Sequence, residues 1–413
     1  MLRSHSAAIA LVLATSLAGC SGAAPGSGSL PPAPTFAPET QAGDAPVAMP
    51  SNVRASCDRP NALGFRCFAL QRTDTGDALT GRITAAFSPG VVPSGYGPKD
   101  LASAYKLPGG SAGAGQTVAV VDAYDNPHAE ADLAVYRAQY GLPACTTANG
   151  CFKKVNQHGV QGSYPAGDPG WGQEESLDVD MVSAVCPNCH IILVEVGSSF
   201  QAGVNAAVKL GATEVSNSYA GHEYARTDAA YNHPGVPITA SAGDDGYRLG
   251  QPASFATVIA VGGTTLERSS NARGWTETVW DGTGSGCSKR VPKPSWQLAS
   301  VFQCTTRTMN DVAAVANPNT GVAVYDSYGR RGNIGWLVFG GTSVSSPIVA
   351  GMYALSGTAK SVNDASGIYA HPSLFNDVTK GNNGRCPIAY LCNGEIGYDG
   401  PTGIGTPIGP SGL

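Results

Sequence analysis

Apolar runs alternate with helical stretches along the chain from about Tyr96 to the C-terminus. Short runs rich in Val, Ile and Ala are typical of strands that are buried on both faces, and the stretches between them have the length and spacing of helices. The alternation predicts an α/β fold with a mainly parallel central sheet covered by helices in three α/β/α layers. We expect strands at residues 117–123, 191–196, 214–218, 236–242, 258–261 and 337–339, and helices at residues 127–140, 174–185, 201–210 and 345–356.

The first 95 residues have a different pattern. Arg3 precedes an apolar run at residues 7–14, which predicts an export signal over residues 1–20 that is too short to span a bilayer stably. Residues 21–50 contain Gly, Ser, Pro and Ala with hardly any large apolar residue, so we expect a flexible tether. Residues 51–95 are interpreted as a short N-terminal arm or a propeptide remnant, and residues 96–413 as one large domain.

The signal ends in Leu17-Ala18-Gly19-Cys20, which is similar to a bacterial lipobox. In such a signal the cysteine becomes the lipidated first residue after cleavage, so a lipid on Cys20 would be the link to a membrane. The alternative is an ordinary signal cleaved within residues 21–24. The protein is therefore expected to be exported, either as a lipoprotein of the cell surface or outer envelope or as a secreted protein.

The chain of 413 residues has a formal net charge of −5, and 13% of its residues are charged. A surface that binds phosphates needs a basic excess, so this composition argues against nucleic acid as a partner. The 54 glycines and 29 prolines indicate many turns around a rigid scaffold. We expect a monomer.

With Cys20 set aside, ten of the 11 cysteines remain, and they fall into close neighbours along the chain. Five short disulfides formed in an oxidising compartment are the economical interpretation, although the sequence leaves other connectivities open. The motif Cys186-Pro187-Asn188-Cys189 is also compatible with a redox or metal site, but the lack of a second such pair favours a structural bridge. The expected pairs are Cys57 with Cys67, Cys145 with Cys151, Cys186 with Cys189, Cys287 with Cys304, and Cys386 with Cys392.

Gly341-Thr342-Ser343 follows the apolar run at residues 336–339 and precedes a helix with Pro347 near its start. This placement predicts that the Ser343 hydroxyl lies at a helix N-terminus, where backbone N–H groups and the helix dipole favour a developing negative charge. A serine becomes a good nucleophile only when an oriented base takes its proton. The chain contains no His-Gly-Thr-His segment to supply that base, so another group is needed.

Glu174 and Asp178 offer a carboxylate pair for this role. They are four residues apart, so on a helix both carboxylates project from one face. Two acids so close are expected to share a proton and to titrate together, which suits proton transfer at acidic pH. Glu175 is the competing candidate, but its rotation away from Glu174 predicts that it faces solvent. The alternative for the whole segment is a solvated acidic helix face.

Asp244 follows the apolar run at residues 236–239 within Ser241-Ala242-Gly243-Asp244-Asp245-Gly246. The carboxyl end of a parallel strand is where α/β enzymes place functional groups. An ionised aspartate would repel an oxyanion, whereas a protonated one donates a hydrogen bond to it. The alternative is an aspartate that only stabilises a turn.

Together these segments resemble the sedolisin family of serine-carboxyl peptidases, which have the subtilisin-like fold but use Ser-Glu-Asp in place of Ser-His-Asp. The resemblance extends from about Tyr96 to the C-terminus. It implies that Ser343 is the nucleophile, Glu174 its base, Asp178 the partner of that base and Asp244 the acid of the oxyanion hole. It further implies an endopeptidase that acts on polypeptide substrates at acidic pH through an acyl-enzyme.

The resemblance also implies one structural Ca²⁺ ion. The family's pattern maps onto Asp377 and Val378, and then onto Glu395, Gly397 and Asp399. Two carboxylates with backbone carbonyls give the oxygen-only coordination that a hard cation prefers. Glu395 stands where the family usually has glycine, so it would bind through its carbonyl. The alternative is a Gly-rich loop held only by a disulfide.

One departure concerns the prodomain, because sedolisins usually carry a large folded one and only a short region precedes Tyr96 here. The maturation site and the need for self-cleavage therefore stay open. Two other functions are also open: a conventional serine protease with a histidine base, and a catalytically silent, surface-anchored binding protein of the same fold. The candidate histidines are His128, His158, His190, His222 and His233, none of them in a recognisable triad motif.

Overall fold

The computed structural model describes residues 49–57, 60–75, 92–298 and 301–413. The expected export signal, the Cys20 lipid site and nearly all of the tether lie outside the described residues. Within the described ranges, no helix has both the length and the apolar character needed to cross a bilayer.

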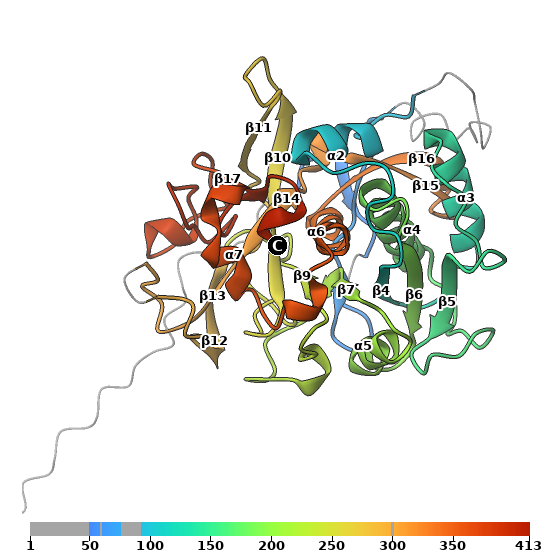
Figure 1. Cartoon of the computed structure of the whole chain (residues 1–413), viewed down its shortest axis with the longest axis horizontal. Coiled ribbons are helices and arrows are strands. Elements are labelled where there is room, and N and C mark those ends of the chain that lie inside the picture. Colours follow the sequence, from blue (N-terminus) through green and yellow to red (C-terminus); the bar gives the residue numbers. More distant parts are fainter. Residues whose placement is uncertain (1–48, 58–59, 76–91, 299–300) are drawn as a thin grey trace, which may run out of the picture. The chain divides into compact units, whose positions relative to one another are not determined.

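An eight-stranded sheet forms the centre of the fold (Figure 1). Its strand order is β11-β10-β9-β7-β4-β6-β5, and β14 also pairs with β10. Every pair is parallel except β10 with β11, so the prediction of a mainly parallel sheet is confirmed. The strands are β4 (Thr117–Ala123), β5 (Phe152–Asn156), β6 (His190–Val196), β7 (Glu214–Asn217), β9 (Ile238–Ser241), β10 (Ile259–Arg268), β11 (Trp275–Val279) and β14 (Val312–Val315).

Helices cover both faces of this sheet. In β4, Val118 and Val120 pack into one apolar cluster with residues of α4 and α6, whereas Val121 packs into another with Phe200 and Val204 of α5. Because successive side chains of a strand point to opposite faces, α4 and α6 cover one face and α5 covers the other. The α-helices are α2 (Pro98–Tyr105), α3 (Ala129–Tyr140), α4 (Pro169–Val185), α5 (Phe200–Lys209), α6 (Thr342–Ser356) and α7 (Ser366–Ala370), of which α3 to α6 are those expected from the sequence.

A second sheet is antiparallel and has the order β1-β3-β16-β15. The strand expected at residues 337–339 forms, but it belongs to this sheet, so its assignment to the parallel sheet is wrong. A short apolar run has the same pattern in either sheet, and its hairpin with the preceding strand decides the pairing. The strands are β1 (Val53–Ala55), β3 (Leu70–Arg72), β15 (Val322–Arg330) and β16 (Asn333–Gly340).

Smaller elements complete the described part of the chain. Three two-stranded sheets join β2 (Arg66–Cys67) to β8 (Tyr219–Ala220), β12 (Gly286–Pro292) to β13 (Thr306–Met309), and β17 (Phe375–Asn376) to β18 (Thr406–Pro407). Short 3₁₀ helices are η1 (Ala229–Tyr231), η2 (Pro318–Thr320), η3 (Ala359–Ser361), η4 (Pro372–Leu374), η5 (Ala389–Leu391) and η6 (Pro410–Gly412).

Helix α4 is buried along its length, from Gly170 to Val185. The side chain of Asp168 caps it by accepting the N–H groups of Gly170 and Trp171, and a proline occupies the first helical position. The helix packs against β4 and β6 of the central sheet and also against α6 and β15. The alternative of a solvated acidic helix face is therefore excluded. The prediction that Glu175 faces solvent is wrong, because the Glu175 side chain is fully buried.

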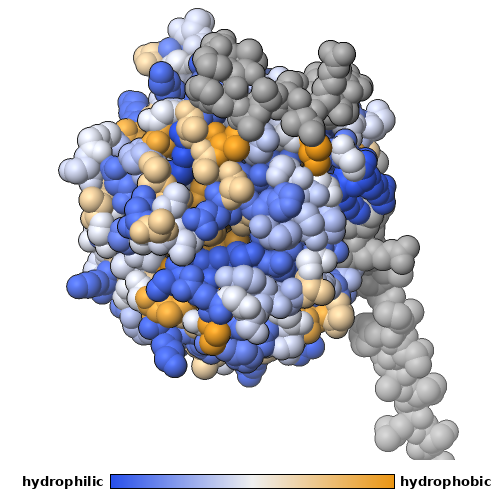
Figure 2. Space-filling model, turned by 90° about the vertical axis from the view of Figure 1, so that its right-hand side faces the viewer, coloured by the Kyte–Doolittle hydropathy of each residue, from blue (hydrophilic) through white to orange (hydrophobic). Residues whose placement is uncertain are grey.

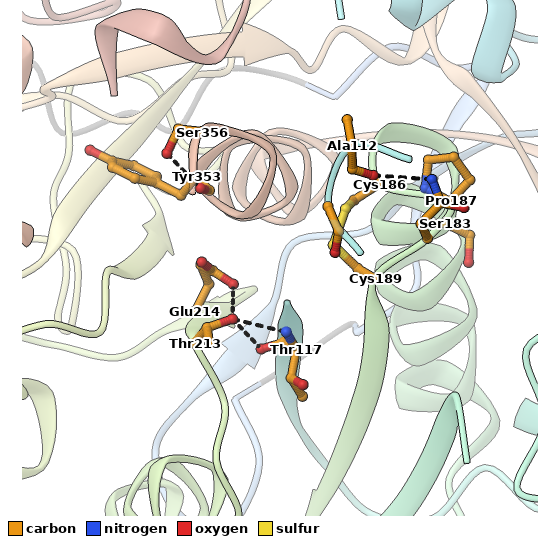
Figure 3. The surroundings of a disulfide bond; sticks show 12 residues. Ala112, Thr117, Ser183, Cys186, Pro187, Cys189, Thr213, Glu214, Tyr353 and Ser356 are labelled. Atoms are coloured by element: carbon orange, nitrogen blue, oxygen red, sulfur yellow. Dashed lines mark hydrogen bonds between the residues drawn. A yellow bond between two sulfur atoms is a disulfide. The ribbon is translucent and has the colours of Figure 1, made fainter. Parts of the chain in front are cut away.

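All five expected cysteine pairs are disulfides. The bridge between Cys186 and Cys189 lies at the C-terminal end of α4 (Figure 3), and both residues are fully buried. Beside it, the Asn188 amide donates a hydrogen bond to the Ala112 carbonyl oxygen at 3.1 Å. The interpretation of this motif as a structural bridge is confirmed.

The face of the molecule on the side of α3 and β5 mixes polar and apolar residues, and its apolar atoms lie in separate small areas (Figure 2). Such scattered exposure of apolar atoms is normal for a folded domain.

Candidate active site

Ser343 lies in the first turn of α6, as the sequence predicts. Strand β16 ends at Gly340, and Gly341 turns the chain into the helix with a φ of +97°. A Cβ at Gly341 would lie 1.7 Å from the carbonyl oxygen of Phe68, so no other residue fits this turn. The first N–H groups of a helix have no intrahelical acceptor, which makes this end of α6 favourable for negative charge.

One short segment of the chain contacts both Ser343 and Glu174. The Phe68 N–H donates to Ser343 Oγ at 3.1 Å, and the Ala69 N–H donates to Glu174 Oε2 at 2.7 Å. The serine hydroxyl and the carboxyl group therefore lie beside two successive peptide bonds, on either side of Phe68. In this structure the hydroxyl donates to the Ser218 carbonyl oxygen at 3.3 Å, and Glu174 Oε1 has no hydrogen-bond partner among the described residues.

Asp178 lies one turn after Glu174 on α4. Its Oδ1 accepts a hydrogen bond from the Ser218 hydroxyl at 2.8 Å, and its Oδ2 is buried with no partner in the described part of the chain. Ser218 thus contacts Asp178 through its side chain and Ser343 through its carbonyl, a connection that the sequence analysis missed. Within the described ranges Asp178 and Glu174 share no direct hydrogen bond, so their coupling is electrostatic.

Asp122 is a further buried carboxyl that the sequence analysis missed. It lies near the end of β4, in register with Glu195 of β6, and points to the face of the sheet that α4 covers. Both of its carboxyl oxygens lack a partner among the described residues. The signal that singled out Asp244, an acid at the carboxyl end of an apolar parallel strand, applies equally to Asp122.

Burial raises the pKa of both Glu174 and Asp178 well above the ordinary range of carboxyl groups. The charge of Asp122 raises both values further, and the nearby Ser343 hydroxyl and the Ala69 N–H partly oppose the rise at Glu174. Burial also raises the pKa of Asp122 to about 8. Three carboxyls in one dry cluster cannot all ionise together, so the cluster holds protons that it can exchange.

Glu175 belongs to a neighbouring cluster. Burial is the main cause that raises its pKa well above the usual range, and Glu195 is the next. Lys154 Nζ lies 2.9 Å from Glu195 and 2.5 Å from Asp125, so this cluster contains a compensating cation. The leading charge effect on Glu175 thus comes from Glu195 in this second cluster, whereas the leading charge effect on Glu174 comes from Asp122.

Asp244 lies on the loop after β9. Its Oδ1 accepts the N–H and the hydroxyl of Thr342, both at 2.8 Å. The residue is partly exposed, but Oδ2 is buried and has no partner in the described part of the chain. A Cβ at Gly341 would lie 2.7 Å from this oxygen and 1.7 Å from the Phe68 carbonyl oxygen, so the two oxygens are neighbours.

Burial raises the pKa of Asp244 to about 7, against the hydrogen bonds from Thr342, which lower it. Below that pH the carboxyl is protonated, and its proton belongs on Oδ2 because Oδ1 already accepts two hydrogen bonds. Asp244 can then donate to a carbonyl oxygen in the position of Phe68 O, as the expectation of an oxyanion-hole acid requires.

No candidate histidine contacts Ser343 within the described ranges. The Nδ1 atom of His128 shares a hydrogen bond with Ser327, and Nε2 of His233 shares one with Asn205. The hydrogen-bond partners of the Ser343 hydroxyl are backbone groups. The arrangement therefore favours a carboxylate base over an imidazole.

The residues expected to bind calcium lie together in the C-terminal part of the chain. Asp377 Oδ2 accepts the Gly397 N–H at 2.9 Å, and Asp399 Oδ2 accepts the Glu395 N–H at 3.1 Å, while Val378 is buried nearby in sequence. Among the described residues no group of three or more His, Cys, Asp or Glu side chains gathers at one point. Two carboxylates with backbone carbonyls still fit a hard cation such as Ca²⁺.

The chain is similar to known serine-carboxyl peptidases, although no family model matches it. It is 32% identical to kumamolisin of Bacillus sp. (strain MN-32) over 377 residues, which is 78% of this chain and 64% of that protein. It is 35% identical to sedolisin of Pseudomonas sp. (strain 101) over 203 residues, which is 42% of this chain and 33% of that protein. The chain thus spans about one to two thirds of the length of these curated relatives.

A solved structure also resembles this fold. It is Pseudomonas sedolisin, a serine-carboxyl proteinase, complexed with two molecules of pseudo-iodotyrostatin. The two folds superpose with a TM-score of 0.62 at 25% sequence identity, over 77% of this chain and 96% of that one.

Proposed function

Because the chain belongs to the sedolisin family, we propose that it is a serine-carboxyl endopeptidase that hydrolyses polypeptides at acidic pH. The observation that carries the proposal is that Ser343 Oγ and Glu174 Oε2 accept the N–H groups of two successive residues, Phe68 and Ala69, so both lie along the same short stretch of backbone. Asp244 Oδ2 lies near the carbonyl oxygen of Phe68 in that stretch. A catalytically silent binding protein would not need a nucleophile, a base and an oxyanion donor along the same stretch of backbone.

In the proposed reaction, Glu174 accepts the hydroxyl proton as Ser343 Oγ attacks the carbonyl carbon of the substrate. The protonated Asp244 carboxyl and the Ser343 N–H hold the oxyanion. When the C–N bond breaks, Glu174 gives the proton to the leaving amine, and an ester to Ser343 remains. Water then hydrolyses the ester with Glu174 again as base, while Asp178 shares the charge on Glu174.

Export is proposed on the basis of the disulfides. Five bridges join cysteines of the described residues, and such bridges persist in oxidising compartments. A lipid anchor at Cys20 is the proposed link to a membrane, and the protein is proposed to act as a monomer. No nucleic-acid partner is proposed.

One Ca²⁺ ion is proposed as a structural cofactor. Asp377 and Asp399 would bind it through their carboxylates, and Val378, Glu395 and Gly397 through their carbonyl oxygens. A bound Ca²⁺ would neutralise the two carboxylates and fix the loop that contains them. It takes no part in the reaction at Ser343.

Two substitutions test the assigned chemistry. Ser343→Ala and Glu174→Gln should each lower kcat on an unfolded protein substrate, at about pH 4, by a factor on the order of 10⁴ or more. Ser270→Ala and Glu267→Gln are matched controls, because both residues are exposed, and they should retain full activity. Full activity of Glu174→Gln would refute the carboxylate base. A histidine base would instead make activity fall on acidification below neutrality.

A further inference from the structure

Two serines at the end of β7 present their hydroxyls to the same face of the sheet. Ser216 lies in β7 and Ser218 directly follows this strand, and side chains two residues apart on a strand point to the same face. Both residues are fully buried. The Ser216 hydroxyl shares a hydrogen bond with the Ser346 hydroxyl of α6 at 2.9 Å, whereas the Ser218 hydroxyl donates to Asp178 Oδ1 at 2.8 Å. Of the two serines, Ser218 is therefore the one whose hydroxyl contacts a candidate catalytic acid in this structure.

The backbone of Ser218 contacts the nucleophile. Its carbonyl oxygen accepts the Ser343 hydroxyl at 3.3 Å, and its own hydroxyl lies 3.5 Å from the Ser343 carbonyl oxygen. The backbone position of Ser218 is fixed on both sides, because β7 pairs with β9 before it and β8 pairs with β2 after it. One residue thus links Ser343 to Asp178, and it does so from a segment with regular backbone pairing.

Asp178 lies among acids without a compensating cation in the described part of the chain. Glu174 influences it from α4 and Asp122 from β4, and both of these groups are acids. Helix α4 contains no Lys, Arg or His, while α6 and β9 contain no charged residue and no histidine. No ion pair of the described residues includes Asp178. The Ser218 hydroxyl is therefore the donor that stabilises a negative charge on Asp178 in this structure.

The hydrogen bond from Ser218 favours both proton arrangements of the acid pair. Burial is the main cause that raises the pKa of Asp178, the charges of Asp122 and Glu174 raise it further, and the Ser218 hydroxyl opposes the rise. When Asp178 is ionised, the hydroxyl stabilises its charge. When Asp178 is neutral, the hydroxyl occupies Oδ1, so the carboxyl proton belongs on Oδ2 and becomes a stronger donor. Without this hydroxyl, a negative charge on the pair is less favourable in either arrangement.

We propose that Ser218 is a positioning residue for the reaction: its hydroxyl stabilises the negative charge of the acid pair Glu174 and Asp178, and its carbonyl holds the Ser343 hydroxyl. The inference rests on the proposed function, since it requires Glu174 to be the base. As Ser343 Oγ attacks, its proton leaves the Ser218 carbonyl and passes to Glu174, while the Ser218 hydroxyl keeps Asp178 in place. No covalent bond of Ser218 forms or breaks, so Ser218 acts through the acids and the nucleophile.

The first test compares Ser218→Ala with the wild type on an added unfolded protein across the acidic pH range, in the same covalent form as verified by intact mass. The substitution removes the hydroxyl and keeps the carbonyl. A charged acid pair then forms less readily, so the fall of kcat on acidification should move to higher pH by about half to one pH unit. On the acidic side of that fall, kcat should be lower by a factor of about 3–10 with KM nearly unchanged. The alkaline side of the profile should not move, because it depends on Asp244 on another loop.

Ser216→Ala is the matched control. It removes an equally buried hydroxyl from the same face of the same segment, and the partner of that hydroxyl is Ser346 rather than an acid. It should lower Tm about as much as Ser218→Ala and leave the pH at which kcat falls unchanged. Ser218→Cys adds a graded test, because a thiol is a weaker donor than a hydroxyl. The fall of kcat in Ser218→Cys should lie between those of the wild type and Ser218→Ala.

Each outcome separates the inference from the proposed function. If Ser218→Ala has the wild-type pH profile, or if its kcat is lower by the same factor at every pH, the inference fails and the proposed function stands. An equal move of the profile in Ser216→Ala, or a wild-type profile in Ser218→Cys, also overturns the inference. If the wild type hydrolyses no added protein at any pH, the proposed function fails and the inference fails with it.

Discussion

At the scale of single residues, burial makes the carboxyl groups of the site share protons, so that one member can be ionised as the base while its neighbours stay protonated. Glu174, Asp178 and Asp122 lie together without a cation beside them in the described part of the chain, and burial is the first cause of each raised pKa. An imidazole in such a site would become charged and lose its function as a base at acidic pH. A carboxyl cluster instead loses its excess charge on acidification, so this set of residues suits chemistry at acidic pH.

Asp244 gives a pH dependence with a definite sign. Its pKa is raised to about 7, so it is a neutral donor below that value and an ionised acceptor above it. The kcat for an added peptide should therefore fall as the pH rises through about 7, because an ionised oxygen repels the oxyanion. Asp244→Asn keeps a hydrogen-bond donor at every pH, so the fall of kcat in this variant should move to a higher pH. Asp244→Ala should lower kcat at acidic pH by a factor on the order of 10²–10³.

The control for this prediction is Asp281→Asn, which removes an exposed carboxyl and should leave the profile unchanged. Steady-state rates of the three variants and the wild type, measured in parallel across the pH range, provide the comparison. If kcat of Asp244→Asn falls at the same pH as kcat of the wild type, a group other than Asp244 causes the fall.

At the scale of elements, α4 is the helix that brings the two acids to the serine. It contributes Glu174 and Asp178 from successive turns, and it packs between the central sheet and β15. The cap at Asp168 fixes where this helix begins, six residues before Glu174. The first turn of α4 should therefore control the position of the base.

The cap gives a prediction on α4. Asp168→Ala should lower the free energy of unfolding by about 0.5–2 kcal/mol, and it should also lower kcat because Glu174 loses its fixed position. Ser199→Ala is the matched control, since Ser199 caps α5 by accepting the Ala202 N–H on the opposite face of the sheet. It should lose similar stability with kcat unchanged. Equal effects of both variants on kcat would contradict a positioning role of the α4 cap.

The sequence predicts most of these elements but not all of their partners. The order and type of α3 to α6 and the turn into Ser343 follow from local periodicity. The burial of Glu175 does not, because helical spacing cannot show that Glu195 of β6 and Lys154 of β5 lie near that side of α4. Within the segment interpreted only as an N-terminal arm or propeptide remnant, β2 and β3 pair with strands distant in sequence, and such pairing leaves no local signal.

At the scale of the whole molecule, segments far apart in sequence meet at one point in front of Ser343. The nucleophile comes from the turn between β16 and α6, the base from α4, and Asp244 from the loop after β9. Phe68 and Ala69, which contact Ser343 and Glu174, come from the N-terminal arm. Each disulfide of the described residues closes a loop of at most 17 residues, so none of them ties these distant segments together. Packing of the two sheets around α4 and α6 keeps these segments in position. Loss of this packing should therefore separate the nucleophile, the base and Asp244 and abolish activity.

The C-terminal loop is the other place where a whole-molecule property can be tested. If Ca²⁺ binds the folded protein at this loop and does not bind the unfolded chain, it raises the free energy of unfolding by about 2.7 kcal/mol at a concentration of about one hundred times Kd. Adding Ca²⁺ should therefore raise the Tm of the wild type, and a chelator should reverse the rise. Asp377→Asn, at an exposed position, should abolish the calcium-dependent shift even if its Tm without calcium is unchanged.

Glu267→Gln removes one exposed charge elsewhere and should keep the full shift. Differential scanning calorimetry with Ca²⁺, Mg²⁺ or chelator at matched ionic strength measures these shifts. An equal shift in the wild type and Asp377→Asn would place the ion elsewhere, and no shift in the wild type would reject the calcium site.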